Sequence, residues 1–313
     1  MIIGFMGDVM IGRLVNQNLE QVESTYLWGD ALPEILQTDL TIANLEAALT
    51  HSTQRVEKVF NFKSHPKNVQ TLLDAEIDVV NLANNHVLDY SEEGLLETLN
   101  TLDKAGIQHV GAGRTLNEAS ASLIISIQDL NIGILGFTDN EPTWEATPDS
   151  PGTRYVDVGD LEKVKEDITT LRQQVDILIV SYHWGPNMIQ RPERSFVRFA
   201  HELVELGVDI FHGHSAHIFQ GIEYFDRKLI MYDTGDFVDD YYVDPFLRND
   251  RSFFFKVQVD KNGVQGVELI PVLISNFQVN LSEDEETVSR MQGLSSEFNT
   301  HLELFEGTLR LNR

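Results

Sequence analysis

Short apolar runs recur along the chain, and each of them predicts a buried β-strand. About four to eight aliphatic, aromatic or β-branched residues in succession suit a strand that is covered on both faces. Four further segments are also strand-like, and the turn signal Lys261-Asn262-Gly263 joins two of them. The predicted strands span residues 2–6, 40–45, 79–83, 122–128, 132–138, 177–182, 208–211, 229–232, 253–260 and 264–271.

Apolar residues spaced three or four apart predict helices between these strands. Gly106 and Gly207 end the second and fourth helices, and a capping box from Ser282 to Glu285 begins the last one. Strands that alternate with helices, followed by hairpin-like strands, predict an α/β or α+β layered fold. The helices are expected at residues 64–76, 91–105, 160–174, 192–206 and 282–302, and loops at 140–151 and 237–251.

Six of the apolar runs end in carboxylate, carboxamide or imidazole side chains. A buried strand explains the apolar residues but does not explain the repeated polar ends. Six such junctions in one chain therefore predict a site that is assembled where strand ends meet. Oxygen and imidazole ligands without thiolates favour Mn, Fe or Zn. The polar ends are Asp8, Glu46, Asn84-Asn85-His86, His183, the group His212, His214 and His217, and the pair Asp233 and Asp236.

Asp8 and Glu46 end the first two of these strands. A single Asp after a strand is also a common helix N-cap or turn former. Glu is a poor turn former, and Asn44 lies two residues before Glu46 on the same face of the strand. In a crowded site, a carboxylate at a strand end can bridge two metal ions. Both residues are therefore candidate metal ligands.

The Asn84-Asn85-His86 cluster is more specific. Two consecutive carboxamides need partners if they are buried, and a metal ion is one such partner. His86 is a candidate metal ligand or general acid, and Asp89 would hold its imidazole in one tautomer. The alternative is an Asn-rich turn before the next helix.

Histidines follow two further strands. A histidine that packs in the core is the simpler alternative for His183. His212, His214 and His217 crowd six residues, and imidazoles so close together have few structural uses, which favours metal ligation. Among these three, His212 lies on the strand side of a glycine and is the weakest candidate.

Asp233-Thr234-Gly235 matches the triplet of aspartic proteases. That chemistry requires two carboxylates that share a proton, from two triplets or two subunits. The sequence holds one triplet, which argues against a protease. It contains no G-x-S-x-G, Walker A or G-x-G-x-x-G motif, so serine-hydrolase and nucleotide-cradle functions have no support.

The net charge narrows the class of partner. With 23 basic and 49 acidic residues, a formal charge of −26 argues against binding nucleic acids or anionic membranes. It also disfavours attraction of polyanions, although bound divalent cations would reverse the sign locally. Basic residues near the polar clusters are candidates to hold an anionic substrate, with surface salt bridges as the alternative. They are Arg13, Lys63, Arg191, Arg194, Arg248 and Arg251.

The chain has 313 residues and no cysteine, which excludes disulfides, thiolate metal sites and a cysteine nucleophile. No apolar run approaches the ~20 residues that a transmembrane helix needs. The first predicted strand begins at Ile2, which leaves no room for a signal peptide. These features predict a soluble, cytoplasmic protein with no membrane span and no nucleic-acid partner.

The order of the polar clusters resembles that of the CapA/PgsA-like family of poly-γ-glutamate capsule biosynthesis proteins, which is related to the calcineurin-like metallophosphoesterases. The resemblance covers residues 3–255. It implies a four-layer fold of two packed mixed β-sheets flanked by helices, with a metal centre at one edge. We expect this domain at residues 1–275, with a C-terminal helical extension, 276–313, packed on it. The motifs are GDVMIGR, NLEAALT, FNFKSHP, VVNLANNHVLDYSEEGLLETLNTLDKAGI, SYHWG, GHSAHIFQGIE and GDFVDDY.

The resemblance also implies a ligand set for one or two divalent ions (Mn, Fe or Zn). The sequence departs from the phosphoesterase pattern at two positions, and both differences fit the capsule-type branch. Met10 stands where the first phosphoesterase motif, Asp-x-His, has its histidine, and Glu46 replaces the bridging Asp. One ion would bind Asp8, Glu46 and His217, and the other would bind Asn85, His183 and His214, with Glu46 bridging.

The resemblance implies catalytic roles as well. His86, paired with Asp89, matches the histidine that protonates the leaving group, and a metal-bridging hydroxide would be the nucleophile. Candidate substrate-binding residues are Asn44, Lys63 and Arg13. One hypothesis is a metal-dependent hydrolase of a phosphoester or γ-glutamyl amide bond, acting on a small anionic substrate or on poly-γ-glutamate. The alternative is a non-catalytic accessory or binding protein of poly-γ-glutamate biosynthesis that retains the metal site.

Overall fold

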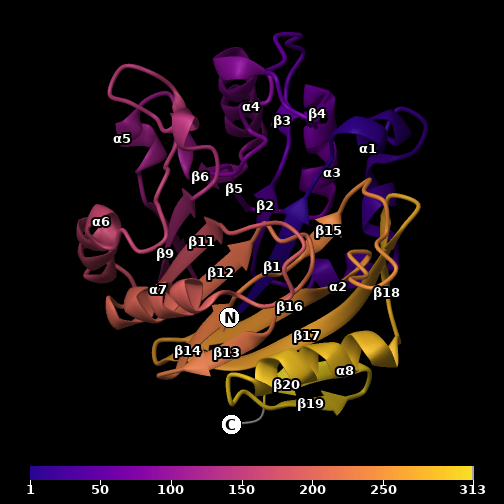
Figure 1. Cartoon of the computed structure of the whole chain (residues 1–313), viewed down its shortest axis with the longest axis vertical. Coiled ribbons are helices and arrows are strands. Elements are labelled where there is room, and N and C mark those ends of the chain that lie inside the picture. Colours follow the sequence, from indigo (N-terminus) through magenta and orange to yellow (C-terminus); the bar gives the residue numbers. More distant parts are fainter. Residues whose placement is uncertain (312–313) are drawn as a thin grey trace.

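Two mixed β-sheets pack face to face in the computed structural model, which describes residues 1–311 (Figure 1). The larger sheet has the order β19-β20-β17-β16-β1-β2-β5-β6, with β15 also paired to β1 and β18 to β17. Strands β1, β2, β5 and β6 are parallel, whereas β16 and β17 are antiparallel to their neighbours. The bounds are β1 (Ile2–Val9), β2 (Leu40–Leu45), β5 (Val79–Asn81), β6 (Gln108–Val110), β15 (Asp236–Val238), β16 (Arg251–Asp260), β17 (Gly263–Ser275), β18 (Gln278–Leu281), β19 (Leu302–Phe305) and β20 (Thr308–Leu311).

The smaller sheet has the order β13-β14-β12-β11-β9-β8. Its central strands are parallel, and the edge strands β8 and β13 are antiparallel. The bounds are β8 (Leu123–Ile127), β9 (Leu130–Thr138), β11 (Ile177–His183), β12 (Ile210–His214), β13 (Ile222–Phe225) and β14 (Lys228–Met231). Two short ladders lie outside these sheets, β3 (Ala48–Leu49) with β4 (Lys63–Ser64), and β7 (Ala112–Gly113) with β10 (Gly152–Thr153).

Helices cover the outer face of each sheet, as Figure 1 shows. The α-helices are α1 (Arg13–Asn18), α2 (Leu32–Ile35), α3 (Val69–Asp74), α4 (Ser91–Ala105), α5 (Leu116–Ala119), α6 (Glu162–Arg172), α7 (Arg194–Glu205) and α8 (Glu285–Ser296). Three 3₁₀ helices complete the described helices: η1 (Ser24–Ala31), η2 (Pro66–Asn68) and η3 (Pro142–Trp144). No helix in the described part of the chain is long and apolar enough to cross a membrane.

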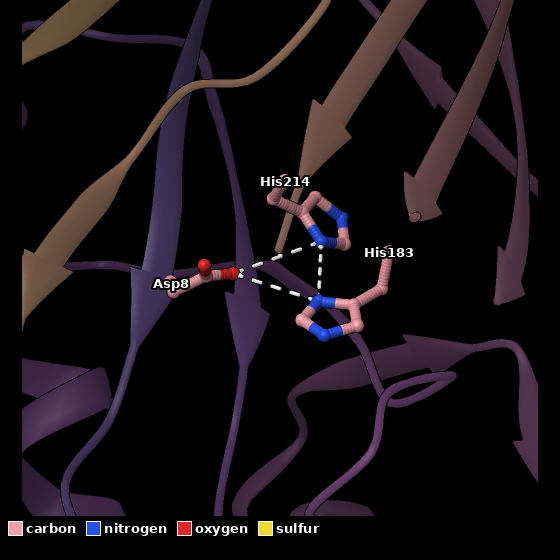
Figure 2. Close-up of side chains that lie close together, drawn as sticks. All are labelled: Asp8, His183 and His214. Carbon is pink, nitrogen blue, oxygen red and sulfur yellow. Dashed lines mark hydrogen bonds and ion pairs between the residues drawn. The ribbon is translucent and has the colours of Figure 1, made fainter. Parts of the chain in front are cut away.

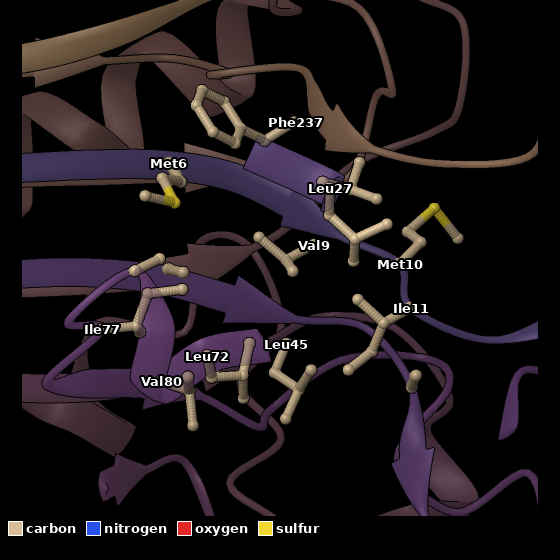
Figure 3. Packing of buried hydrophobic residues seen from close by; sticks show 14 of the residues in the cluster. Met6, Val9, Met10, Ile11, Leu27, Leu45, Leu72, Ile77, Val80 and Phe237 are labelled. Carbon is tan, nitrogen blue, oxygen red and sulfur yellow. The ribbon is translucent and has the colours of Figure 1, made fainter. Parts of the chain in front are cut away.

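Alternating residues along the strands build three hydrophobic layers, because successive side chains point to opposite faces of a sheet. Phe5 of β1 and Ile179 of β11 belong to the layer between the sheets. Met6 packs under the helices that cover the larger sheet, together with Leu72 of α3 (Figure 3). Val180 faces α6 and α7. The chain therefore has the four-layer fold that the family resemblance implies.

Helix α8 and the strands around it differ from the sequence prediction. The helix begins at Glu285 with Asp284 as its N-cap, whose side chain accepts the Thr287 N–H, so the prediction of a Ser282 cap is wrong. It ends at Ser296, and Asn299 has a left-handed backbone, φ +56°, that a continuing helix does not allow. Strands β18, β19 and β20 accompany α8 in the predicted extension 276–313, of which residues 312–313 lie outside the described part. The boundary after residue 275 stays a prediction.

Candidate metal centre

The carboxyl ends of strands from both sheets meet at one site. Asp8 ends β1, and His183 and His214 lie opposite each other in register at the ends of β11 and β12. The Asp8 Oδ1 is 3.7 Å from the Nδ1 of each histidine, and the two Nδ1 atoms are 3.0 Å apart. Figure 2 shows the three side chains converging. All three are fully buried.

A second group shares Asp8 with the first. Its other members are Glu46, just beyond β2, and His217, and the ligand atoms of the three residues lie within 4.8 Å of one another. The His217 Nδ1 is 3.4 Å from the Asp8 Oδ2 and 2.8 Å from the Asp236 Oδ1. Asp8 is thus the carboxylate common to both groups. The bridging role that the resemblance implies for Glu46 stays a prediction.

Close backbone approach brings these candidate ligands together. A Cβ on Gly7 would lie 1.8 Å from the Gly235 carbonyl oxygen, so only glycine lets β1 approach this segment. Gly235 itself has φ +71°, which favours glycine. His217 also has a left-handed backbone, φ +58°, which is uncommon for a residue with a side chain and recurs at functional sites.

Burial and neighbouring charges shift the pKa values of the residues in the two ligand groups, some upward and some downward. Burial opposes ionisation of Asp8, but the neighbouring imidazoles of His183 and His217 hold its pKa well below the usual value. Burial and the charge of Asp8 raise the pKa of Glu46 well above normal. Burial lowers the pKa of His214, whereas for His217 the charges of Asp236 and Glu46 outweigh burial and raise it.

In the two ligand groups, two buried side-chain atoms have no hydrogen-bond partner: the Glu46 Oε1 and the His217 Nε2. Buried polar atoms are nearly always paired, so an unpaired carboxylate oxygen beside an unpaired imidazole nitrogen calls for a missing partner. A divalent cation accepts both atom types as ligands. The residues present therefore fit a metal ion.

His86 lies beside this cluster. Its Nδ1 contacts the Asp89 Oδ2 at 2.5 Å, and its Nε2 is 3.6 Å from the Glu46 Oε1. Because Asp89 is the acceptor, Nδ1 carries the proton and Nε2 faces the cluster. Burial lowers the pKa of His86 to about 4, although Asp89 opposes the shift. The ring packs edge-on against Phe62.

Asparagines orient the carboxylates. The Asn44 Nδ2 donates to the Asp8 Oδ1 at 2.7 Å, and the Asn44 Oδ1 accepts from Asn81 and Asn84 at 3.2 Å each. Both polar atoms of the Asn44 side chain therefore have hydrogen-bond partners within the protein. Asn85 is different, because its Oδ1 reaches the His183 Nε2 at 3.0 Å and lies at the rim of the cluster.

The two predicted basic substrate-binding residues lie in different places. Arg13 pairs with Asp240 at 3.2 Å, and its guanidinium lies within 5.9 Å of the Tyr241 ring, which packs against His217. Lys63 donates to the Ser52 carbonyl at 2.7 Å and lies over the Tyr90 ring, so both of these contacts are outside the two ligand groups.

Sequence reasoning missed Lys58. Its Nζ is 3.1 Å from the Asp89 Oδ1 and also contacts the Asn85 carbonyl. The signal was weak, because Lys58 lies in an irregular segment with no strand end beside it. The sequence predicts Asp236 as a polar strand end, whereas in the structure it begins β15 and bonds to His217.

The remaining polar strand ends have structural roles. His212 bonds with Ser181 and Thr234 behind the cluster, at 3.2 and 3.3 Å. Asp233 accepts the backbone N–H groups of Ala216 and Gly235. These bonds hold the loop that carries His217. Asp233 therefore stabilises a turn and does not form the carboxylate pair of an aspartic protease.

Comparison with known proteins decides the family. Residues 2–241 match the family of the bacterial capsule synthesis protein PGA_cap. This chain belongs to that family. Its relatives include a probable polyglutamine synthesis accessory protein of Mycobacterium tuberculosis, 31% identical, with 90% of this chain and 79% of the relative aligned. Another is the PGA biosynthesis protein CapA of Bacillus subtilis, 30% identical over 86% of this chain and 70% of that protein.

Solved structures share the fold of this PGA_cap family member. A phosphatase of Mycoplasma pneumoniae aligns with a TM-score of 0.53 at 16% identity, over 87% of this chain and 93% of that one. A putative 5'-nucleotidase of Staphylococcus aureus aligns with a TM-score of 0.50 at 14% identity, over 94% of this chain and 58% of the other. The chain therefore shares its fold with these two proteins.

Proposed function

We propose that this chain is a metal-dependent hydrolase that cleaves a phosphoester or a γ-glutamyl amide bond. The observation that carries the proposal is the position of the His86–Asp89 pair, 3.6 Å from Glu46 at the edge of two ligand groups that share Asp8. A cation site alone needs no such pair. A proton donor beside a cation site is what hydrolysis requires.

In this proposal Asp8, Glu46 and His217 hold one divalent ion, and His183, His214 and Asn85 hold a second. Bound ions at these groups would acidify a water molecule, which supplies a nucleophile at neutral pH, and would neutralise charge on the attacked group. The metal identity, Mn, Fe or Zn, is open to measurement.

In this proposal His86 first takes up a proton from solvent at Nε2 and then delivers it to the leaving oxygen or nitrogen. Asp89 fixes the ring through Nδ1, and Nε2 therefore points at the site of bond cleavage. Burial leaves the resting ring neutral at pH 7 because its pKa is about 4. An anionic substrate beside Nε2 would raise that pKa and favour protonation.

Arg13 is the proposed substrate anchor. Its Nη1 is buried and has no hydrogen-bond partner, while its Nε pairs with Asp240. An anionic group that accepted the Nη1 hydrogen would remove this deficit. Lys63 and Asn44 are also proposed to bind the substrate, but we rank them below Arg13 because both side chains already bond within the protein. A cytoplasmic location stays a proposal as well.

A second function has support from Met10. This residue stands where the phosphoesterase motif has a ligand, and it is fully buried in the hydrophobic layer beneath the helices. One relative is named an accessory protein of polyglutamine synthesis. The second candidate is therefore an accessory protein that keeps the cation site to bind carboxylates of poly-γ-glutamate without cleaving it.

Metal analysis by mass spectrometry, followed by a screen of phosphoester and γ-glutamyl substrates, tests the proposal. The wild type should hold one to two equivalents of Mn, Fe or Zn, and His214→Ala should lose them. His86→Ala should keep the metal while turnover falls by roughly 10²–10⁴-fold, the range for loss of a general acid. Metal without turnover on any substrate would favour the accessory function, and no metal uptake on reconstitution would refute both.

A further inference from the structure

Four arginines line a pocket outside the metal centre. The pocket has a volume of about 400 Å³, and we call it the arginine pocket after Arg191, Arg248, Arg251 and Arg290. Glu286 and Glu297 are the acidic residues in its wall. Four of the chain's 23 basic residues therefore gather in one place on a molecule with a formal charge of −26.

Three of these arginines have carboxylate partners. Arg191 pairs with Glu297 at 2.7 Å, Arg248 with Asp250 at 2.7 Å, and Arg251 with Glu286 at 2.8 Å. The named partners satisfy these guanidinium groups in part and hold them at fixed positions around the pocket. Arg290 differs from the other three.

Arg290 has no carboxylate within ion-pair distance among residues 1–311. Its Nη1 donates to the Leu247 carbonyl, its guanidinium lies 4.6 Å from the centre of the Phe219 ring, and its Nε and Nη2 are buried without a partner. Buried guanidinium groups are normally paired, because an isolated buried charge is costly. Burial and the neighbouring Arg251 also lower the pKa of Arg290, as expected for a missing anion.

Two chain segments lead from the metal centre to the arginine pocket. One follows His183 and reaches Arg191, which also lines a small cavity beside Trp184 and Ala216. The other leaves Tyr241, which packs against His217, and reaches Arg248. His183 and Arg191 are eight residues apart and Tyr241 and Arg248 are seven, so chain length limits these separations to at most ~29 and ~25 Å, lengths that an extended ligand could span.

We propose that the arginine pocket binds carboxylates of an acidic chain, such as a γ-linked glutamate oligomer, whose reacting bond lies at the metal centre. Guanidinium groups match carboxylates in bidentate geometry. The pocket would give a polyanion a point of attachment on a surface that otherwise repels it. The identity of the chain rests on the proposed function, whereas the binding of an oxyanion by the pocket does not.

Isothermal titration with a γ-linked glutamate pentamer, free glutamate and inorganic phosphate tests this proposal. The proteins are the wild type, Arg290→Gln, Arg248→Gln and the control Arg114→Gln. The control also removes one positive charge, from an exposed arginine that pairs with Asp103 and Glu118. The pentamer should bind the wild type and the control alike, and bind the two pocket variants at least 10-fold more weakly. Free glutamate should bind more weakly than the pentamer.

Equal affinity in all four proteins, or no binding of the pentamer, would overturn the proposal, and binding of phosphate alone would overturn the assignment to an acidic chain. If Arg290→Gln does not fold, Arg248→Gln carries the test. His214→Ala separates the two proposals. Pentamer binding that survives loss of the metal supports the pocket even if the hydrolase proposal fails. Binding lost only with the metal would place the ligand at the metal centre and refute the pocket.

Discussion

Burial sets the protonation of the histidines in the metal centre, residue by residue. It lowers the pKa of His86 and of His212 to about 4 each, and it lowers that of His214 as well. His217 behaves in the opposite way, because the charges of Asp236 and Glu46 outweigh its burial and raise its pKa well above the usual value. Neutral imidazole is the form that binds a metal ion. His214 is therefore ready to bind, whereas His217 must first lose a proton.

Metal uptake should release protons. Glu46 and His217 both hold protons more tightly than usual, so a cation that binds them displaces those protons. The affinity for Mn²⁺ should therefore rise as the pH rises from 6 to 8. Titration in buffers of different ionisation enthalpy should give about one or more protons released per ion. His217→Gln should release fewer protons, and an affinity independent of pH would contradict the assignment of these ligands.

At the scale of elements, the sequence predicts both ends of helix α4 correctly, but it places the end of helix α8 too late in the chain. Helix α4 has the predicted bounds, because Gly106 adopts the left-handed C-cap conformation, φ +79°. Helix α8 is shorter than predicted because the apolar residue Leu302 faces the core from a strand and not from a helix. Periodicity over a short stretch does not distinguish these two ways of burying a side chain.

Glycines at the junction of β1 with the segment before β15 give a test at this scale. Gly7→Ala would place a Cβ 1.8 Å from the Gly235 carbonyl oxygen. The change should lower the free energy of unfolding by about 3 kcal/mol, as overpacking does, and weaken metal binding. Gly293→Ala in α8 is the control, since its Cβ meets no atom within 4 Å. It should stabilise the protein by about 0.5–1 kcal/mol. Urea denaturation measures both, and equal effects would contradict the close approach.

At the scale of the whole molecule, the sequence predicts which strand ends carry candidate ligands but not which partners these side chains take. Asp8, His183 and His214 were predictable because each ends a buried strand, and parallel strands place such ends at one edge. The Asn44 contacts with Asn81 and Asn84 depend on sheet register, which one strand's pattern does not give. The contact of Lys58 with Asp89 and the contact of Arg290 with the Leu247 carbonyl each involve an irregular segment. The local sequence pattern does not predict where such segments lie in the fold.

Metal binding should stabilise the whole fold, because the ligands come from both sheets. A ligand that binds the folded state alone adds about 2.7 kcal/mol at a concentration of 100 times its Kd. The midpoint of thermal unfolding should therefore rise with Mn²⁺ in the wild type. Glu46→Ala should abolish this rise, and Glu76→Ala, a change at an exposed glutamate that belongs to neither ligand group, should leave it intact. Equal shifts in all three proteins would indicate binding elsewhere.

The spread of the ligands along the chain, from residue 8 to residue 217, has a consequence for how the protein acquires its site. During synthesis, strands β1, β2, β5 and β6 emerge long before His217, so a chain that ends before residue 217 cannot assemble the complete candidate ligand set. Contacts between segments so distant in sequence form slowly. In a refolding experiment, recovery of metal affinity should therefore lag behind recovery of helical signal, and would mark the moment at which the two sheets dock.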